Sequence, residues 1–458
     1  MKLAVVGAGW AGMAAAVAAV EQGADVTVFE AARTLGGRAR ALPAQLPDGT
    51  PLTLDNGQHI LIGAYSETLA LMQRVGLDLS QAVLPLPLAL PYPDGTGLHT
   101  PAWAARWPAP LDALAAIATT RGWSWGERLA LVRASLRWQR GGFTCAPTLT
   151  VADLCERLPP RVMRELIEPL CVSALNTPTV DASAAVFLRV LRDALFGPGA
   201  AGFSGSSLLL PRTDLSRLFP DAAAQWLHQR HGDAARVRIG TRVSTLRPFG
   251  AQWLLGHEGG EEAFDGVLWA TAASPAAQAM RQAADACDED GAKTLKAWAR
   301  SAHTLPFTAL TTVYAWAPGA RLASPLLALR PDPDAQAAPA QFVFDRGQLD
   351  PRNAAAQGVL AFVVSASSGE RDELQARVLQ QAAAQLGLGT LQALQTVVEK
   401  RATFACTPGL VRPVQAIAPG LWAAGDYVQG PYPATLEGAV RSGLAAAALA
   451  AEALRRHA

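Results

Sequence analysis

The sequence predicts an α/β protein in which a discontinuous domain with a mainly parallel sheet is interleaved with an α+β domain of helices and an antiparallel sheet. Three observations lead to this fold class. Residues 1–30 read as strand, glycine loop, helix and strand; a helical region followed by four short apolar runs fills the middle; and the C-terminus returns to a buried strand and an alanine-rich helix. At 458 residues, the chain is too long for one ordinary core.

The N-terminal pattern is typical of a dinucleotide-binding unit. An apolar run at 2–6 leads into the loop GAGWAG and an alanine-rich helix at 13–22, and a second apolar run at 24–30 ends in Glu30. In this Rossmann-like unit the glycines permit a tight turn, close approach of a pyrophosphate and close helix–strand packing. The acid is placed to accept hydrogen bonds from an adenosine ribose. Loop residues predicted to bind the cofactor are Gly7, Gly9, Ala11 and Gly12.

A secretory signal peptide is the alternative for this stretch, because an early lysine, an apolar run and small residues occur in that order. Cleavage would discard the glycine loop, yet Glu30 stands correctly placed beyond it. We therefore expect the loop to bind a dinucleotide.

A second glycine motif follows the ribose acid. Arginines flank a Gly-Gly pair, which supplies another close backbone approach and fixed positive charge for a diphosphate. At this point the chain resembles the flavoprotein superfamily of amine oxidases and carotenoid-type desaturases, which carry a similar twin-glycine segment. The resemblance implies FAD rather than NAD as cofactor. The residues concerned are Arg33, Gly36, Gly37 and Arg38.

Composition excludes several function classes. The formal net charge is +1 with 17% charged residues, and no basic stripe predicts a nucleic-acid partner. The five cysteines are widely spaced without a CxxC pair, which disfavours a disulfide framework and a zinc site and suits a reducing cytoplasm. No apolar run approaches the roughly 18–20 residues that span a bilayer. We expect no metal and a cytoplasmic protein, soluble or peripheral on the inner face of the membrane.

The segment after the twin glycines combines a strand at 52–55 with Gly57 and His59, and a helix is predicted over 66–75. It is similar to plant-type phytoene desaturases, which carry Gly-x-His beside the flavin. His59 is therefore predicted at the flavin edge as the proton donor, with Asp55 holding its orientation. The alternative is that both residues only shape the flavin site, with His59 as a hydrogen-bonded core residue.

Five tryptophans and five arginines alternate between residues 103 and 138, where helices are predicted over 111–119 and 125–139. Aromatic rings interleaved with cations suit a membrane interface, where tryptophan anchors and arginine extends to the lipid headgroups. An ordinary helical core with a solvated arginine face is the equal alternative. The residues are Trp103, Trp107, Trp123, Trp125 and Trp138, with Arg106, Arg121, Arg128, Arg133 and Arg137.

The rest of the middle region alternates between the two units. Further helices are predicted over 151–157, 161–175, 183–195, 214–228, 275–300 and 371–386, and strands over 311–317, 325–330, 341–346 and 359–365 form an antiparallel meander. The family resemblance places an adenine-contacting backbone at Val243. The predicted division is 1–83, 204–274 and 399–458 for FAD binding, with helices at 84–203 and a sheet at 275–398 for substrate.

The C-terminal motif completes the expected cofactor site. A buried strand ends in Gly425 and Asp426, and residues 431–443 open the last helix. In the flavoprotein superfamily this aspartate binds the ribityl or phosphate part of FAD, and the helix start lies under the flavin pyrimidine. Free amides at Thr435 and Leu436 would stabilise the negative charge of reduced flavin. No cysteine stands in this segment, so FAD is expected to bind non-covalently.

In detail the chain resembles the squalene-associated FAD-dependent desaturases, the hydroxysqualene dehydroxylases of bacterial hopanoid biosynthesis. The resemblance implies reduction of a long apolar isoprenoid alcohol to squalene. Within enzymes the alternative is a carotenoid-type desaturase or isomerase; a non-catalytic flavin-binding partner of a squalene-synthase-like assembly is a further one. No second nucleotide motif appears, so an external reductant is expected, and isoprenoid-synthase partners are compatible with such a substrate.

Overall fold

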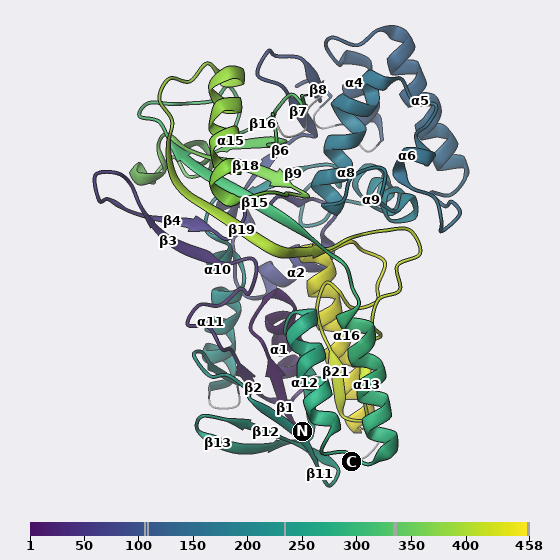
Figure 1. Ribbon diagram of the computed structural model, residues 1–458, viewed down its shortest axis with the longest axis vertical. Coiled ribbons are helices and arrows are strands. Elements are labelled where there is room, and N and C mark those ends of the chain that lie inside the picture. Colours follow the sequence, from purple (N-terminus) through teal and green to yellow (C-terminus); the bar gives the residue numbers. More distant parts are fainter. Residues whose placement is uncertain (105–106, 108–109, 233–234, 333–336, 456–458) are drawn as a thin grey trace.

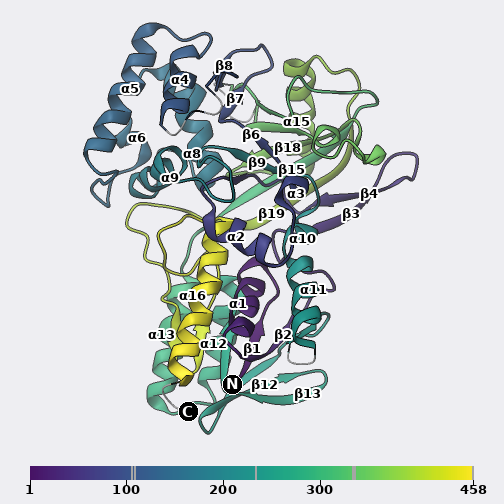
Figure 2. The ribbon, with the colours of Figure 1, turned by 180° about the vertical axis from the view of Figure 1, so that it is seen from behind.

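The computed structural model describes residues 1–104, 107, 110–232, 235–332 and 337–455. Figure 1 shows two stacked halves, with both chain termini at the bottom of the lower half. The upper half holds a long antiparallel sheet beside a group of helices, and the view from behind shows the same division (Figures 1 and 2). The predicted fold class, an α/β unit interleaved with an α+β unit, is confirmed.

A six-stranded sheet forms the centre of the lower half. The strand that is first in the chain, β1 (Lys2–Val6), has a parallel neighbour on each side. Its residue Val5 lies opposite Val28 on one neighbour and opposite Leu268 on the other. Five strands are parallel and the sixth, at one edge, is antiparallel. In spatial order the strands are β10 (Ala235–Arg238), β2 (Asp25–Phe29), β1 (Lys2–Val6), β14 (Gly266–Trp269), β21 (Leu421–Ala423) and β20 (Ala416–Ala418).

Successive side chains of β1 point to opposite faces of the sheet, and helices cover both faces. This burial on both faces explains why the sequence of β1 is continuously apolar. Leu3 and Val5 pack with one layer of helices, whereas Ala4 and Val6 pack with the opposite layer. The first layer holds α1 (Trp10–Glu21), α11 (Pro220–His231) and α16 (Leu436–Arg455). The second holds α12 (Ala273–Ala284), α13 (Glu289–His303) and the antiparallel sheet of β11 (Thr245–Phe249), β12 (Gln252–His257) and β13 (Gly260–Phe264).

The alanine-rich composition of α1 allows close packing. Eleven of its twelve residues are buried. A Cβ on Gly443 of α16 would come within 2.1 Å of the Ala11 carbonyl oxygen, so the two helix backbones nearly touch. Small side chains are therefore required on both helices.

Two long predicted helices are each divided. The helix predicted over 275–300 is the pair α12 and α13, because Asp288 caps a new helix by accepting a hydrogen bond from the backbone amide of Gly291 at 2.9 Å. The helix predicted over 214–228 is α10 (Leu215–Leu218) followed by α11, which begins at Pro220. Proline cannot donate the backbone hydrogen bond that would continue the first helix.

The upper half contains a five-stranded antiparallel sheet, but it is not the predicted meander. Its first strand in the chain pairs with the fourth and not with the second, as a meander would require. The helix α15 (Arg371–Leu386) packs on the sheet, and after it the fifth strand pairs with the other edge of the first. In spatial order the strands are β16 (Leu326–Ala328), β17 (Phe342–Asp345), β18 (Val359–Ser365), β15 (Phe307–Trp316) and β19 (Gln392–Phe404).

Helices form the other side of the upper half. The predictions at 111–119, 125–139 and 183–195 agree with α4 (Leu111–Thr119), α5 (Trp125–Arg140) and α9 (Ala184–Phe196). The helix predicted over 151–157 ends sooner, as α6 (Val151–Leu154). The helix predicted over 161–175 contains a π-helical turn, so it divides into α7 (Pro160–Val162), the turn at Met163–Ile167 and α8 (Glu168–Leu175).

Short elements connect the halves. Three small antiparallel sheets contain β3 (Ala41–Gln45) with β4 (Pro51–Asp55), β5 (Leu61–Ile62) and β6 (Val83–Leu86) with β9 (Leu208–Pro211), and β7 (Ala89–Pro91) with β8 (Gly97–His99). Short helices are α2 (Ser66–Arg74), as predicted, α3 (Leu79–Ala82), α14 (Arg346–Leu349) and the 3₁₀ turn Ala354–Ala356. Among the described residues, no helix is long and apolar enough to cross a membrane.

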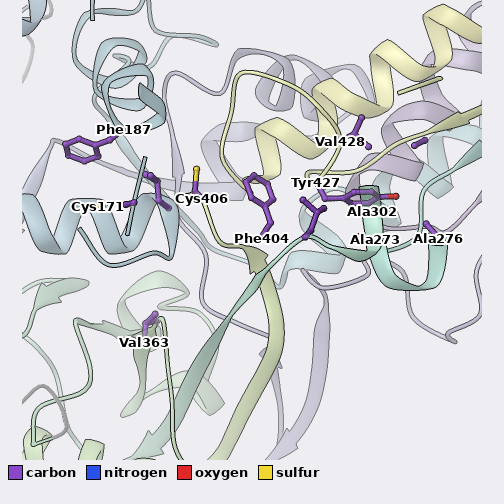
Figure 3. Packing of buried hydrophobic residues seen from close by; sticks show 14 of the residues in the cluster. Cys171, Phe187, Ala273, Ala276, Ala302, Val363, Phe404, Cys406, Tyr427 and Val428 are labelled. Carbon is purple, nitrogen blue, oxygen red and sulfur yellow. The ribbon is translucent and has the colours of Figure 1, made fainter. Parts of the chain in front are cut away.

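One hydrophobic core joins the halves. Figure 3 shows Phe404 and Cys406 between the helices that carry Cys171 and Phe187 and the region around Ala273. Three predicted domain boundaries fall inside elements: 83/84 in β6, 274/275 in α12 and 398/399 in β19. β19 pairs with β15 from Gln392 to Phe404, so it belongs as a whole with the antiparallel sheet.

Candidate functional site

A cavity of about 660 Å³ extends from the carboxyl ends of β1 and β2 to the start of α16. Ligands of α/β folds bind in such crevices. We call it the glycine-loop cavity. The predicted residues that line it are Gly7, Gly9, Ala11, Glu30, Gly36, Gly37, Arg38, Gly57, His59, Val243, Gly425, Asp426, Thr435 and Leu436. Gly12, Arg33 and Asp55 are not among its lining residues.

The glycines of the loop have different geometric tasks. Gly7 has a φ of +108°, and a Cβ there would lie 2.8 Å from the Ala270 carbonyl oxygen. Gly12 packs behind the loop, since its Cβ would lie 1.9 Å from the Gly7 carbonyl oxygen. At Gly9 the nearest protein atoms would be 3.9 Å from a Cβ, so the space beside it belongs to the cavity. The backbone thus leaves an open cradle at Gly9.

Glu30 lines the part of the cavity where the sequence predicts that the adenosine ribose binds. Its carboxylate accepts hydrogen bonds from the backbone amides of Ala8 and Ala32, each at 2.8 Å, which ties the glycine loop to the end of β2. Val243 also lines this cavity. Arg33 is exposed in the turn after β2 and is not among the described lining residues, so its role in cofactor binding stays a prediction.

A charged pair also lines this cavity. Arg38 donates a hydrogen bond to Asp426 at 2.5 Å and another to the carbonyl oxygen of Ala402. The pair joins the twin-glycine turn to the Gly-Asp motif, although 388 residues separate them in the chain. Positive and hydrogen-bonding groups from both predicted motifs therefore meet in one cavity.

His59 is held by its own turn. Its Nδ1 lies 2.8 Å from the carbonyl oxygen of Gly57. A carbonyl only accepts, so Nδ1 carries the proton and the neutral ring presents a lone pair at Nε2. Burial lowers the pKa of His59; the hydrogen bond to Gly57 opposes this shift and the nearby Arg38 cation adds to it. The neutral ring has no proton to give from Nε2, which disfavours the prediction that His59 is the proton donor.

Asp55 does not hold His59. It accepts a hydrogen bond from the backbone amide of Leu215 at 2.8 Å and forms an ion pair with Arg346 at 3.2 Å. Burial raises the pKa of Asp55, while Arg346 opposes the shift. The predicted Asp55–His59 contact is therefore wrong: the carboxylate faces α10 and α14 and joins the two halves of the protein.

A second cavity of about 330 Å³ lies among α4, α5, α8, α9 and the antiparallel sheet. We call it the apolar cavity, because leucine, isoleucine, valine, alanine and phenylalanine supply most of its lining. Asp193 is the one carboxylate among its described lining residues, and it is paired with Arg189 at 2.7 Å and Arg192 at 3.0 Å. Its contents are therefore shielded from unpaired charge.

The two cavities share part of their walls. The residues common to both are His59, Leu310, Thr403, Ala434, Thr435 and Leu436. They come from the turn after β4, from β15 and β19, and from the start of α16. A molecule in one cavity can therefore contact a molecule in the other.

The start of α16 is fixed by two side chains. Thr435 accepts a hydrogen bond from the backbone amide of Gly438 at 3.0 Å, as a helix-capping residue does. Glu437 is fully buried and accepts hydrogen bonds from the backbone amides of Glu67 and Thr68 at the start of α2. An ion pair with Arg441 at 2.7 Å accompanies them. The Glu437 carboxylate therefore joins the N-termini of α2 and α16 next to the shared wall.

Comparison with known proteins identifies the architecture. The model of the flavin containing amine oxidoreductase family matches residues 10–451. The chain belongs to this family. It is therefore an FAD-dependent oxidoreductase, as the glycine motifs predicted.

Two known proteins are similar to this chain over nearly its full length. Hydroxysqualene dehydroxylases of Sinorhizobium fredii and Rhodopseudomonas palustris are 26% and 27% identical, with 97% of both chains covered in each case. A zeta-carotene desaturase of Zea mays is 35% identical over 78 residues, or 17% of this chain and 13% of that protein. Among solved structures, an oxidoreductase from Methanosarcina mazei has a TM-score of 0.70 at 14% identity and covers 97% and 99% of the two chains.

The residues of the glycine-loop cavity fit the flavin cofactor of this family. The cradle at Gly9 is open, and the hydroxyl of Tyr427, which lines the cavity, is buried without a hydrogen-bond partner among the described residues. An orphaned buried hydroxyl is unfavourable unless a ligand satisfies it. None of the five cysteines is among the described lining residues, and the expected non-covalent attachment stays a prediction.

Tyr427 and Glu437 are the functional residues that sequence reasoning missed. Tyr427 directly follows the Gly-Asp motif, and that position was the available signal. Glu437 lies within residues 431–443, which were predicted to open the last helix, but its partners are 369 and 370 residues away. No local pattern predicts such a contact.

Proposed function

We propose that this family member reduces hydroxysqualene to squalene. The observation that carries the proposal is the apolar cavity that shares a wall with the glycine-loop cavity at His59. Full-length similarity to proteins named hydroxysqualene dehydroxylase supports the same substrate class.

The overall change replaces a carbon–oxygen bond by a carbon–hydrogen bond, consumes one hydride and one proton, and releases water. Bound FAD in its reduced form supplies the hydride. The protein's own part is to bind an extended hydrocarbon, exclude water and hold the hydroxyl-bearing carbon at the shared wall. Each buried methylene contributes about 0.8 kcal/mol to such binding.

His59 acts here as a positioning group. Its neutral ring carries the acceptor Nε2, so we propose that it accepts a hydrogen bond from the substrate hydroxyl. The start of α16, capped by Thr435, contributes the positive end of a helix dipole where a reduced flavin carries negative charge. An external reductant returns the flavin to its reduced form.

The second candidate is a carotenoid-type desaturase, favoured by the local similarity to zeta-carotene desaturase. The two reactions run in opposite redox directions. A desaturation would need the bound cofactor in its oxidised form, whereas a dehydroxylation would need it in its reduced form.

Anaerobic rapid mixing separates the candidates. Chemically reduced enzyme mixed with hydroxysqualene is expected to regain oxidised-flavin absorbance and to form squalene in equal amount. Free reduced FAD with the same alcohol is the control. Reduced enzyme that stays bleached with the alcohol, while oxidised enzyme is bleached by a polyene, would establish the desaturase instead.

A further inference from the structure

Seven large apolar side chains are exposed on one stretch of the helical region. They make up half of the fourteen exposed large hydrophobic residues in the described part of the chain. We call the group the tryptophan surface; it consists of Trp103, Trp107, Leu111, Leu114, Trp125, Leu129 and Leu136. Trp125 is 76% exposed and Trp103 60%. Of the other predicted tryptophans, Trp123 and Trp138 are buried, so the core alternative holds for these two rings.

The helices α4 and α5, which carry five of these seven residues, also line the apolar cavity. Ala113 and Ile117 of α4, and Leu131 and Trp138 of α5, are lining residues of the cavity. Each helix therefore has one apolar face inward and another outward. Both helices lie at an outer corner of the upper half in two opposite views (Figures 1 and 2).

The charge around the tryptophan surface is positive. Arg121, Arg133, Arg137 and Arg140 are exposed, and none of the four has an ion-pair partner among the residues that the structure describes. The carboxylates of the same two helices are engaged elsewhere. Asp112 is buried against Ser206 at 2.5 Å, and Glu127 accepts from the backbone amide of Ser124 at 2.7 Å. Arg106 lies outside the described residues.

We propose that the tryptophan surface seats the enzyme on a bilayer that contains anionic lipid. Indole rings partition to the level of the lipid headgroups, and arginine side chains reach lipid phosphates while their stems stay in apolar surroundings. Large apolar side chains that gather on an exposed region mark a contact with another protein or with a membrane. Since only α4 and α5 separate the surface from the apolar cavity, a lipid-soluble substrate needs no passage through water. The proposal does not depend on which isoprenoid the enzyme takes.

Vesicle flotation with the full-length, FAD-loaded protein tests this proposal without substrate. Vesicles of phosphatidylcholine alone are compared with vesicles that also contain phosphatidylglycerol. Wild type is expected to float with the anionic vesicles and to be released by salt. The double variant Trp103→Ser/Trp125→Ser should partition roughly tenfold less, because two interfacial anchors are lost.

Matched variants exclude a general effect. Phe249→Ser/Val411→Ser removes two apolar side chains that are 55% and 82% exposed elsewhere, and it should float like wild type. Arg133→Gln/Arg137→Gln should lose the preference for anionic vesicles but keep its flavin. Equal partitioning of wild type and the tryptophan variant overturns the proposal. So does a dimer of the wild type, measured by light scattering, that the tryptophan substitutions dissociate, because a second copy would then cover the surface.

Discussion

The two cavities that meet at His59 are built in different ways. The glycine-loop cavity is shaped by backbone: positive φ at Gly7, an open cradle at Gly9 and a close helix–strand contact at Gly12. The apolar cavity is shaped by side chains from helices and strands that are distant in the chain. The first is therefore sensitive to single atoms added near the backbone, whereas the second depends on the volume and polarity of many side chains.

Removing the Glu437 carboxylate, which joins the N-termini of α2 and α16, should have the largest effect on stability. Glu437→Ala leaves two backbone amides and Arg441 without their common acceptor. We expect the free energy of unfolding to fall by about 3–5 kcal/mol, as for other broken buried ion pairs. Denaturant unfolding measures the change. Glu67→Ala, which removes a 3.8 Å contact with the same arginine, is the control and should lower stability by less than about 1 kcal/mol.

Substitution at the loop should break the first cavity alone. Gly9→Val adds a Cβ whose nearest protein atoms lie 3.9 Å away and directs its methyl groups into the cradle, so apoprotein stability should be retained while FAD affinity falls by about 100-fold, or about 2.8 kcal/mol. Titration of apoprotein with FAD measures the loss. Gly12→Ala is the contrast, because its Cβ meets the Gly7 carbonyl and should destabilise the apoprotein itself. Equal FAD affinity of Gly9→Val and wild type would remove the loop from the binding site.

The difference between the cavities also decides what the sequence could predict. The glycines act through local backbone geometry, and Glu30 and Asp426 follow buried strands within short motifs, so the sequence alone identifies these positions. Tyr427 lies beside such a motif but is identified only by its orphaned hydroxyl in three dimensions. The partners of Asp55, the position of β19 and the lining of the apolar cavity depend on long-range packing, which no local pattern encodes.

The pH dependence of stability should report His59 at the shared wall. Its pKa in the folded protein is lowered, so the unfolded chain binds more protons once pH falls below the ordinary histidine value of about 6.5. Stability contributed by the neutral ring is present above that value and is lost as pH decreases, with a slope of at most about 1.4 kcal/mol per pH unit. Unfolding of wild type and His59→Gln between neutral and mildly acidic pH is the measurement. Parallel curves would contradict the buried neutral ring.

Tyr427 should give a smaller and more selective effect. Tyr427→Phe removes the orphaned hydroxyl, so the apoprotein should be as stable as wild type or slightly more so. FAD affinity should fall by about tenfold, because one buried hydrogen bond contributes about 0.5–1.5 kcal/mol. Calorimetry of FAD binding with apoprotein melting curves separates the two quantities. Unchanged FAD affinity would show that the hydroxyl does not face the cofactor.

The proposed function depends most on the contact between the two cavities. Its direct test is titration of oxidised, FAD-loaded protein with squalene, the proposed product, while the flavin absorption spectrum is recorded. We predict a saturable spectral shift in wild type and in Val172→Phe, a control on α8 that lies outside the cavity lining. Ala174→Phe, which fills the apolar cavity from the same helix, should lose the shift while keeping its FAD. Squalene that binds wild type without changing the flavin spectrum, or an equal shift in Ala174→Phe, would contradict the account.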